Sequence, residues 1–134
     1  MIVPLGRALV RAEEPVLAAH GLTMWGYVVL LALAGQPARS QAALAAQIRA
    51  DKTRLIPVLD DLQERALIER HPDPTDRRVH LLAVTPAGRR TAAQAQQEIQ
   101  HQEDELLAQL PPEDRAPFLR ALDVLSARIR EQPS

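Results

Sequence analysis

Two short amphipathic segments followed at once by a hairpin pattern, between Arg39 and Thr85, constrain the fold of this chain more than any other feature. Ser40 is a suitable N-cap for a helix over about 41–48, and Asp51 is suitable for a second one. The second helix carries apolar residues at the i, i+3, i+4 and i+7 positions, namely Leu55, Val58, Leu59 and Leu62. This spacing predicts two short helices that are joined by a tight turn, with one face of the second helix buried.

The hydrophobic period changes after residue 67. Residues 68–71 and 79–84 are extended runs rich in β-branched side chains, and residues 72–76 between them have the composition of a turn. We therefore predict a β-hairpin with a polar tip. A helix-turn-helix followed by such a hairpin can read DNA, because the second helix fits the major groove and the hairpin tip reaches the neighbouring backbone or minor groove.

Helical patterns fill the rest of the chain. The first helix is expected over residues 4–20, with a kink or break at Pro15 because proline removes a backbone donor. Thr23 and Thr85 are suitable N-caps for two further helices, which are expected to reach Gly35 and about Leu110. A last helix follows the pair of prolines at 111–112, and it carries a row of apolar residues that needs a partner helix: Phe118, Leu122, Leu125 and Ile129. The predicted fold class is mainly α with a small β-hairpin wing.

Side chains that face away from the buried stripe of the second short helix are candidates for DNA contact. Thr53 can hydrogen-bond base edges or phosphate, and Arg54 can contact guanine or clamp a phosphate. Ile56 or Pro57 can touch a thymine methyl, while two arginines at the hairpin tip suit a narrow minor groove. The predicted DNA-binding residues are Arg39, Ser40, Gln41, Lys52, Thr53, Arg54, Ile56, Pro57, Arg77 and Arg78.

The segments 51–55, 67–70 and 73–78 resemble the MarR family of bacterial transcriptional regulators. The wing signature D-x-R-x-x-x-L-x-x-T of that family is complete, and its positions are Asp76, Arg78, Leu82 and Thr85. The resemblance implies a single MarR-like domain over residues 1–134, in which 23–85 form a winged helix-turn-helix lobe and 1–20 with 86–131 form a helical dimerisation region. It also implies a homodimer on a palindromic operator.

In the family, the wing aspartate orients an arginine by an ion pair, and the tip arginine enters the minor groove. The resemblance carries these roles to Asp76, Arg77 and Arg78, and leaves open which arginine does which. Pro57 departs from the family, in which many members have a basic or hydroxyl residue there. Because proline can kink the helix, base reading is expected to shift to the helix N-terminus. Asp60 and Asp61 are expected to lie away from phosphates or to weaken DNA binding.

Charge and composition narrow the functional classes. Although the net charge is −1, basic residues outnumber acidic ones over 49–91, and the acidic excess lies in 92–134. The absence of cysteine excludes disulfides, thiolate zinc sites and thiol redox sensing within the chain. The four histidines lack metal-ligand spacing, and no catalytic triad or phosphate loop is present, so we expect no enzyme, metal or cofactor.

His20, Trp25 and Tyr27 are the predicted effector-pocket residues, because the resemblance places a cleft beside the helix that follows Thr23. A small aromatic or lipophilic effector could stack there, although packing in the core is the ordinary role of a scarce aromatic side chain. The leading hypothesis is a cytoplasmic, ligand-responsive repressor that binds double-stranded DNA as a homodimer, with no membrane partner. The alternatives are a winged-helix protein-interaction module without specific DNA binding, and a small hydrolase or metal enzyme.

Overall fold

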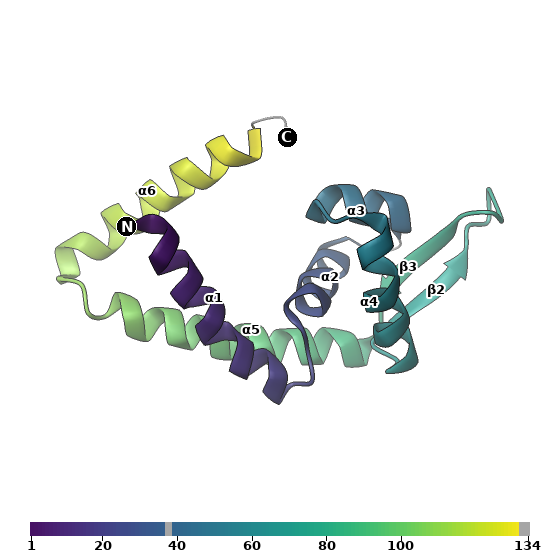
Figure 1. The fold of residues 1–134 in the computed structure, drawn as a ribbon, viewed down its shortest axis with the longest axis horizontal. Coiled ribbons are helices and arrows are strands. Elements are labelled where there is room, and N and C mark those ends of the chain that lie inside the picture. The colour runs from purple at the N-terminus through teal and green to yellow at the C-terminus, as the bar shows by residue number, and fades with distance from the viewer. Residues whose placement is uncertain (37–38, 132–134) are drawn as a thin grey trace. The chain divides into compact units, whose positions relative to one another are not determined.

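The computed structural model describes residues 1–36 and 39–131, and for Arg39 it describes the backbone alone. The chain divides into two compact units, residues 1–97 and 98–134. The elements follow one another as α1 (Ile2–Ala19), α2 (Met24–Gly35), β1 (Arg39–Ser40), α3 (Gln41–Ile48), α4 (Lys52–Glu64), β2 (Ile68–Pro72), β3 (His80–Val84), α5 (Pro86–Leu107) and α6 (Pro112–Glu131) (Figure 1). The predicted fold class, mainly α with a small hairpin wing, is confirmed.

The helices of the first unit begin where polar side chains can satisfy the free backbone N–H groups of a first turn. Thr23 Oγ1 accepts from the backbone N–H of Gly26 at 3.1 Å, and Ser40 Oγ accepts from that of Ala43 at 3.1 Å. Thr85 Oγ1 accepts from the backbone N–H of Gly88 at 3.0 Å. The predicted starts of α2, α3 and α5 are therefore confirmed.

Two boundaries differ from the prediction. The helix α1 begins at Ile2 and runs unbroken through Pro15, so of the kink or break considered there the break does not occur. The helix α5 ends at Leu107 instead of Leu110, because the last N–H groups turn back to carbonyls three residues earlier.

The core of the first unit is built around α2, as the ribbon in Figure 1 indicates. Its fully buried side chains include Leu17, Leu30, Leu33, Leu44, Leu55, Leu59, Leu62, Ile68 and Leu82. The predicted inward stripe of α4 is thus buried, with Val58 half-buried beside it. Gly88 closes this packing, since a Cβ there would lie 2.1 Å from the Leu67 carbonyl oxygen.

The sheet has three antiparallel strands in the order β1-β3-β2. In the hairpin, Ile68 pairs with Val84 and Pro72 with His80, which sets β2 and β3 in register along their whole length. The strand β1, which the sequence pattern did not indicate, pairs Ser40 with Leu81. Because β1 follows α2 and leads directly into α3, this pairing ties the helix-turn-helix to the base of the hairpin.

The helix α6, in the second unit, keeps its apolar row exposed. Phe118 is 37% exposed, Leu122 42%, Leu125 51% and Ile129 61%. In the first unit, α1 likewise exposes Ile2, Val3, Leu5 and Val10. Exposed apolar rows of this length are typical of interaction surfaces.

No single helix within the described residues is long and apolar enough to cross a membrane. By length and composition only, α1 and α2 pass that test as a pair, with a bend of 80° between them.

Candidate nucleic-acid interface

The first turn of α4 presents polar side chains to solvent, while a buried leucine anchors the opposite face of the helix. Lys52, Thr53 and Arg54 are exposed, whereas Leu55 is 1% exposed. Ile56 and Pro57 continue the exposed surface by a further half-turn. The five predicted DNA-binding side chains of α4 therefore lie together on one end of an exposed helix.

Asp51 caps α4 and also holds the side chain of Thr53. Its Oδ1 accepts from the Thr53 backbone N–H at 3.0 Å and from the Thr53 hydroxyl at 2.6 Å. These two hydrogen bonds, the hydroxyl bond first, lower the pKa of the Asp51 carboxyl below its ordinary value. The carboxylate is therefore ionised, and the Thr53 hydroxyl has a fixed direction.

The helix α4 continues through Pro57, and its adjacent carboxylates Asp60 and Asp61 are paired with arginines. Asp60 Oδ1 lies 2.8 Å from Arg70 Nη1 on β2, and the same nitrogen donates to Gln63 Oε1 at 2.8 Å. Asp61 Oδ2 lies 3.5 Å from Arg65 Nη1, which also donates to the Gly21 carbonyl. The sequence analysis missed these partners, which fasten α4 to β2 and to the turn after α1.

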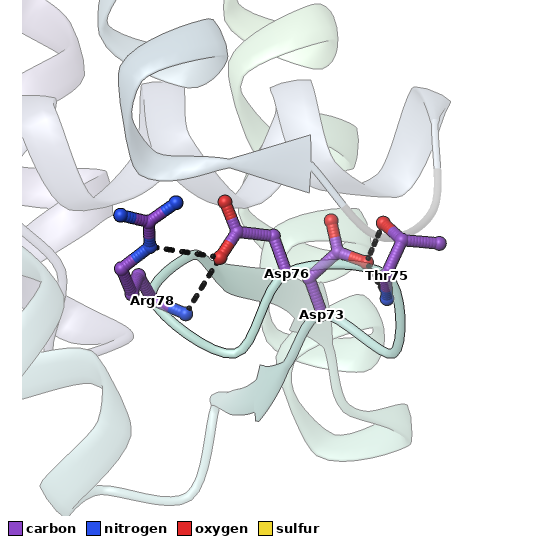
Figure 2. A network of polar contacts seen from close by, with 4 residues as sticks. All are labelled: Asp73, Thr75, Asp76 and Arg78. Atoms are coloured by element: carbon purple, nitrogen blue, oxygen red, sulfur yellow. Dashed lines mark hydrogen bonds and ion pairs between the residues drawn. The ribbon is translucent and has the colours of Figure 1, made fainter.

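We use the term wing for β2, β3 and their connection, residues 68–84; it extends beyond α4 in Figure 1. Its tip is ordered by two hydrogen-bonded turns (Figure 2). Asp73 Oδ1 accepts from the Thr75 backbone N–H at 2.9 Å and from its hydroxyl at 2.7 Å, and the first of these bonds contributes most to lowering the pKa of Asp73. The Asp73 backbone N–H donates to the Val79 carbonyl at 2.8 Å, which closes the tip.

Asp76 selects one of the two tip arginines. Its Oδ1 accepts from the Arg78 backbone N–H at 3.1 Å and lies 3.3 Å from Arg78 Nε (Figure 2). The Arg78 side chain remains 92% exposed, so both terminal nitrogens of the guanidinium are available. Arg77 is exposed beside it, and no hydrogen bond of its side chain occurs within the described residues.

The two remaining signature residues lie at the base of the wing. Leu82 is fully buried in the central strand β3. Thr85 is 8% exposed, and its hydroxyl donates to the Ala66 carbonyl at 2.7 Å while accepting from Gly88. These contacts join the end of α4, the end of the hairpin and the start of α5.

The predicted residues around the start of α3 fall into two groups. Ser40 and Gln41 are half-buried, and the Ser40 hydroxyl is taken up as the N-cap of α3. The side chain of Arg39 lies outside the described part of the chain.

The predicted effector residues differ in exposure and in the cavities of the described residues that they border. Trp25 is 41% exposed and borders a cavity of about 180 Å³ with Arg49, Asp51 and Arg54, next to the start of α4. Tyr27 is buried, at 8% exposure, and the half-buried His20 ends α1. Residues two apart on a helix point to nearly opposite sides, which separates Trp25 from Tyr27.

Metal-ligating side chains do not gather in the part of the chain that the structure describes. No group of three or more histidine, aspartate or glutamate side chains there could hold a metal ion.

Comparison with known proteins connects this geometry with a family. A model of the MarR family matches residues 20–79. A protein from Thauera aromatica, assigned as a transcriptional regulatory protein for the hcr operon, is 32% identical over 115 residues, covering 86% of this chain and 69% of that protein.

Solved structures of similar proteins cover nearly the whole chain. The transcriptional repressor CouR bound to a 23-mer DNA duplex has a TM-score of 0.81 at 28% identity, covering 93% of this chain and 89% of that one. CouR from Rhodococcus jostii RHA1 bound to p-coumaroyl-CoA has a TM-score of 0.80 at 25% identity, covering 99% and 92%. This chain belongs to the MarR family of transcriptional regulators.

Proposed function

We propose that this chain is a ligand-responsive repressor that binds a palindromic operator as a homodimer. The observation that carries the proposal is the pair of exposed basic features on one lobe: the first turn of α4 and the wing tip, where Asp76 holds Arg78 by two contacts. The family consists of transcription regulators, not enzymes, so a role in gene control is favoured over catalysis. We place this role in the cytoplasm.

In the proposed complex, α4 lies in the major groove and the wing follows the neighbouring minor groove. We assign the minor-groove insertion to Arg78, because its ion pair with Asp76 orients the guanidinium before DNA arrives. Lys52 and Arg54 contact phosphate or guanine, and Ile56 and Pro57 contact a thymine methyl. A DNA-bound structure of CouR, at 28% identity, supports this mode of binding.

The winged lobe, residues 23–85, is proposed to read DNA, while 1–20 and 86–131 hold two copies together. Exposed apolar side chains on α1 and α6 support a dimer, since they would otherwise remain in water. A two-fold dimer presents its two α4 helices about 34–36 Å apart, one turn of DNA. Light scattering tests this: Leu125→Glu should yield monomers, whereas Arg120→Glu, on the opposite face of α6, should leave the dimer intact. A monomeric wild-type protein would overturn this part of the proposal.

A small aromatic or lipophilic effector is proposed to release the operator. A cavity of about 180 Å³ beside Trp25 is large enough for one aromatic ring, and it adjoins Arg54, so a ligand there would compete with DNA. The binding of p-coumaroyl-CoA by CouR supports an aromatic acyl ligand. Trp25 is the only tryptophan, so its fluorescence reports the site directly. We expect p-coumaroyl-CoA to quench it and to release DNA, with coenzyme A as the control; release without quenching would place the effector elsewhere.

The decisive experiment measures binding to DNA. Selection from genomic fragments should enrich a palindrome, and fluorescence anisotropy should show affinity that falls steeply with salt. Arg78→Ala should weaken binding strongly, while Arg128→Ala, which removes the same charge from α6, should change it little. If no sequence were enriched over competitor DNA, the chain would instead be a winged-helix protein-interaction module.

A further inference from the structure

Two exposed threonines of the winged lobe make the same contact with an aspartate two residues earlier. On α4, the Thr53 hydroxyl lies 2.6 Å from Asp51 Oδ1, and on the wing the Thr75 hydroxyl lies 2.7 Å from Asp73 Oδ1. In both pairs the same Oδ1 also accepts the threonine backbone N–H, at 3.0 Å and 2.9 Å. The sequence therefore contains the arrangement Asp-x-Thr twice, once on each proposed DNA-reading element.

The contact determines which hydrogen-bonding role of the hydroxyl remains. A threonine hydroxyl has one proton and two acceptor lone pairs, and a carboxylate can only accept. The proton of Thr53 must therefore point to Asp51, and an O–H···O⁻ separation of 2.6 Å is typical of a strong, charge-assisted bond. Toward any third group, the Thr53 oxygen presents lone pairs only.

We propose that Thr53 reads its base as a hydrogen-bond acceptor and that Asp51 is the positioning residue that imposes this role. The proposal rests on the proposed function, in which α4 occupies the major groove. In that groove the exocyclic amines N6 of adenine and N4 of cytosine are donors, whereas O6 and N7 of guanine and O4 of thymine are acceptors. Thr53 therefore selects adenine or cytosine at the base that it faces.

The same geometry removes a role that the residue type alone would allow. A phosphate oxygen only accepts hydrogen bonds. Because the Thr53 hydroxyl already donates its proton to Asp51, it has no proton left to donate to a phosphate. The ionised Asp51 behind the hydroxyl also repels a phosphate. Thr53 is thus a base-reading residue, and backbone contacts fall to the neighbouring Lys52 and Arg54.

The test measures operator affinity with every base at every position of one half-site. For the wild-type protein, one position should favour adenine and cytosine over guanine and thymine by about three- to tenfold, the range of one hydrogen bond. Thr53→Val, which keeps the shape of the side chain, should abolish this preference and leave the other positions unchanged. A preference that survives Thr53→Val would overturn the proposal.

Asp51→Gly separates the positioning role from the contact itself. Glycine is a tolerated N-cap, so α4 should still form, and circular dichroism checks that it does. The freed Thr53 hydroxyl can then donate, and guanine or thymine should become acceptable at that one position. Unchanged discrimination in a folded Asp51→Gly protein would show that Asp51 does not position Thr53.

Asp73→Gly is the matched control, since it removes the same charge from the same Asp-x-Thr arrangement on the wing. Any change in operator affinity that it causes should be the same for all four bases at the position that Thr53 faces. The outcomes distinguish the two proposals: a wild-type protein that enriches no palindrome contradicts the proposed function. A protein that binds an operator specifically but shows no adenine and cytosine preference contradicts only the role of Thr53.

Discussion

The first turn of α4 and the tip of the wing carry the same polar arrangement but are held in place in different ways. The turn of α4 stands on Leu55, Leu59 and Leu62, which are all 1% exposed or less. The tip, residues 73–79, has no buried side chain, and its order comes from hydrogen bonds between neighbours. The placement of the reading helix is thus coupled to the stability of the whole lobe, whereas the tip can be altered without unfolding it.

This contrast explains where the arginines lie. Arg78 is 92% exposed and still oriented, because Asp76 accepts both its backbone N–H and its side-chain Nε. By comparison, Asp60 and Asp61 of α4 pair with Arg70 of β2 and with Arg65, the C-cap residue of α4, and so fasten the helix to its surroundings. The ion pairs of α4 hold the helix in place, whereas the ion pair on the wing orients the exposed guanidinium of Arg78.

The largest effect is expected from the buried foundation of α4. Leu59→Ala removes a fully buried side chain and should lower the free energy of unfolding by about 2–5 kcal/mol, as lost burial and a cavity act together. Urea unfolding measures this. Arg78→Ala, at the exposed tip, should change the same quantity by less than about 0.5 kcal/mol. Similar losses in the two variants would contradict the separation of helix and tip.

The second-largest effect concerns operator affinity and leaves the free energy of unfolding nearly unchanged. Arg78→Ala should weaken operator binding by about 1–3 kcal/mol, the range of one specific arginine contact. Arg77→Ala removes the same charge, but Arg77 has no orienting contact within the described residues, so a smaller loss is expected. Anisotropy at several salt concentrations separates the two, because the loss of a phosphate contact lowers the salt slope by about one. A larger loss for Arg77→Ala would exchange the two roles.

Sequence reasoning predicted the elements whose signals are local. The N-caps Thr23, Ser40, Asp51 and Thr85 bond to groups two or three residues away, so composition alone places them. The short strand β1 has no such signal, since two residues carry no periodicity and their partner in β3 lies far along the chain. The break considered at Pro15 shows a local rule that was given too much weight, whereas the kinks considered at Pro15 and Pro57 stay predictions. Both helices continue through their prolines.

At the candidate site, spacing predicted candidate residues but not their partners. The signature allowed either tip arginine to pair with Asp76, and the turn geometry favours Arg78. The expectation that Asp60 weakens DNA binding left out its partner Arg70. That arginine is ten residues away on a strand, and surface charges follow no period that would reveal the pair. Trp25 and Tyr27 lie two residues apart on α2 and point to different sides of it, so the effector pocket that groups them stays a prediction.

A smaller effect is expected from the residue that orients Arg78. Asp76→Ala keeps the arginine and its charge but removes the ion pair, and exposed pairs contribute about 0.2–1 kcal/mol. Operator affinity should therefore fall only a few-fold, and the salt slope should stay the same. An alternative outcome, in which Asp76→Ala binds as poorly as Arg78→Ala, would mean that the aspartate orders the whole tip.

The smallest effect compares the two Asp-x-Thr pairs by their titration. Both carboxyls have a pKa below the ordinary 3.8, so each contributes stability above its unfolded pKa, and this contribution is lost as the pH falls through the lower, folded pKa. For Asp51 the hydroxyl bond is the largest cause, whereas for Asp73 the backbone N–H is. Thr53→Val should therefore raise the pKa of Asp51 more than Thr75→Val raises that of Asp73. Carboxyl titration by NMR measures both, and equal shifts would remove the distinction between an aspartate that holds a side chain and one that holds a turn.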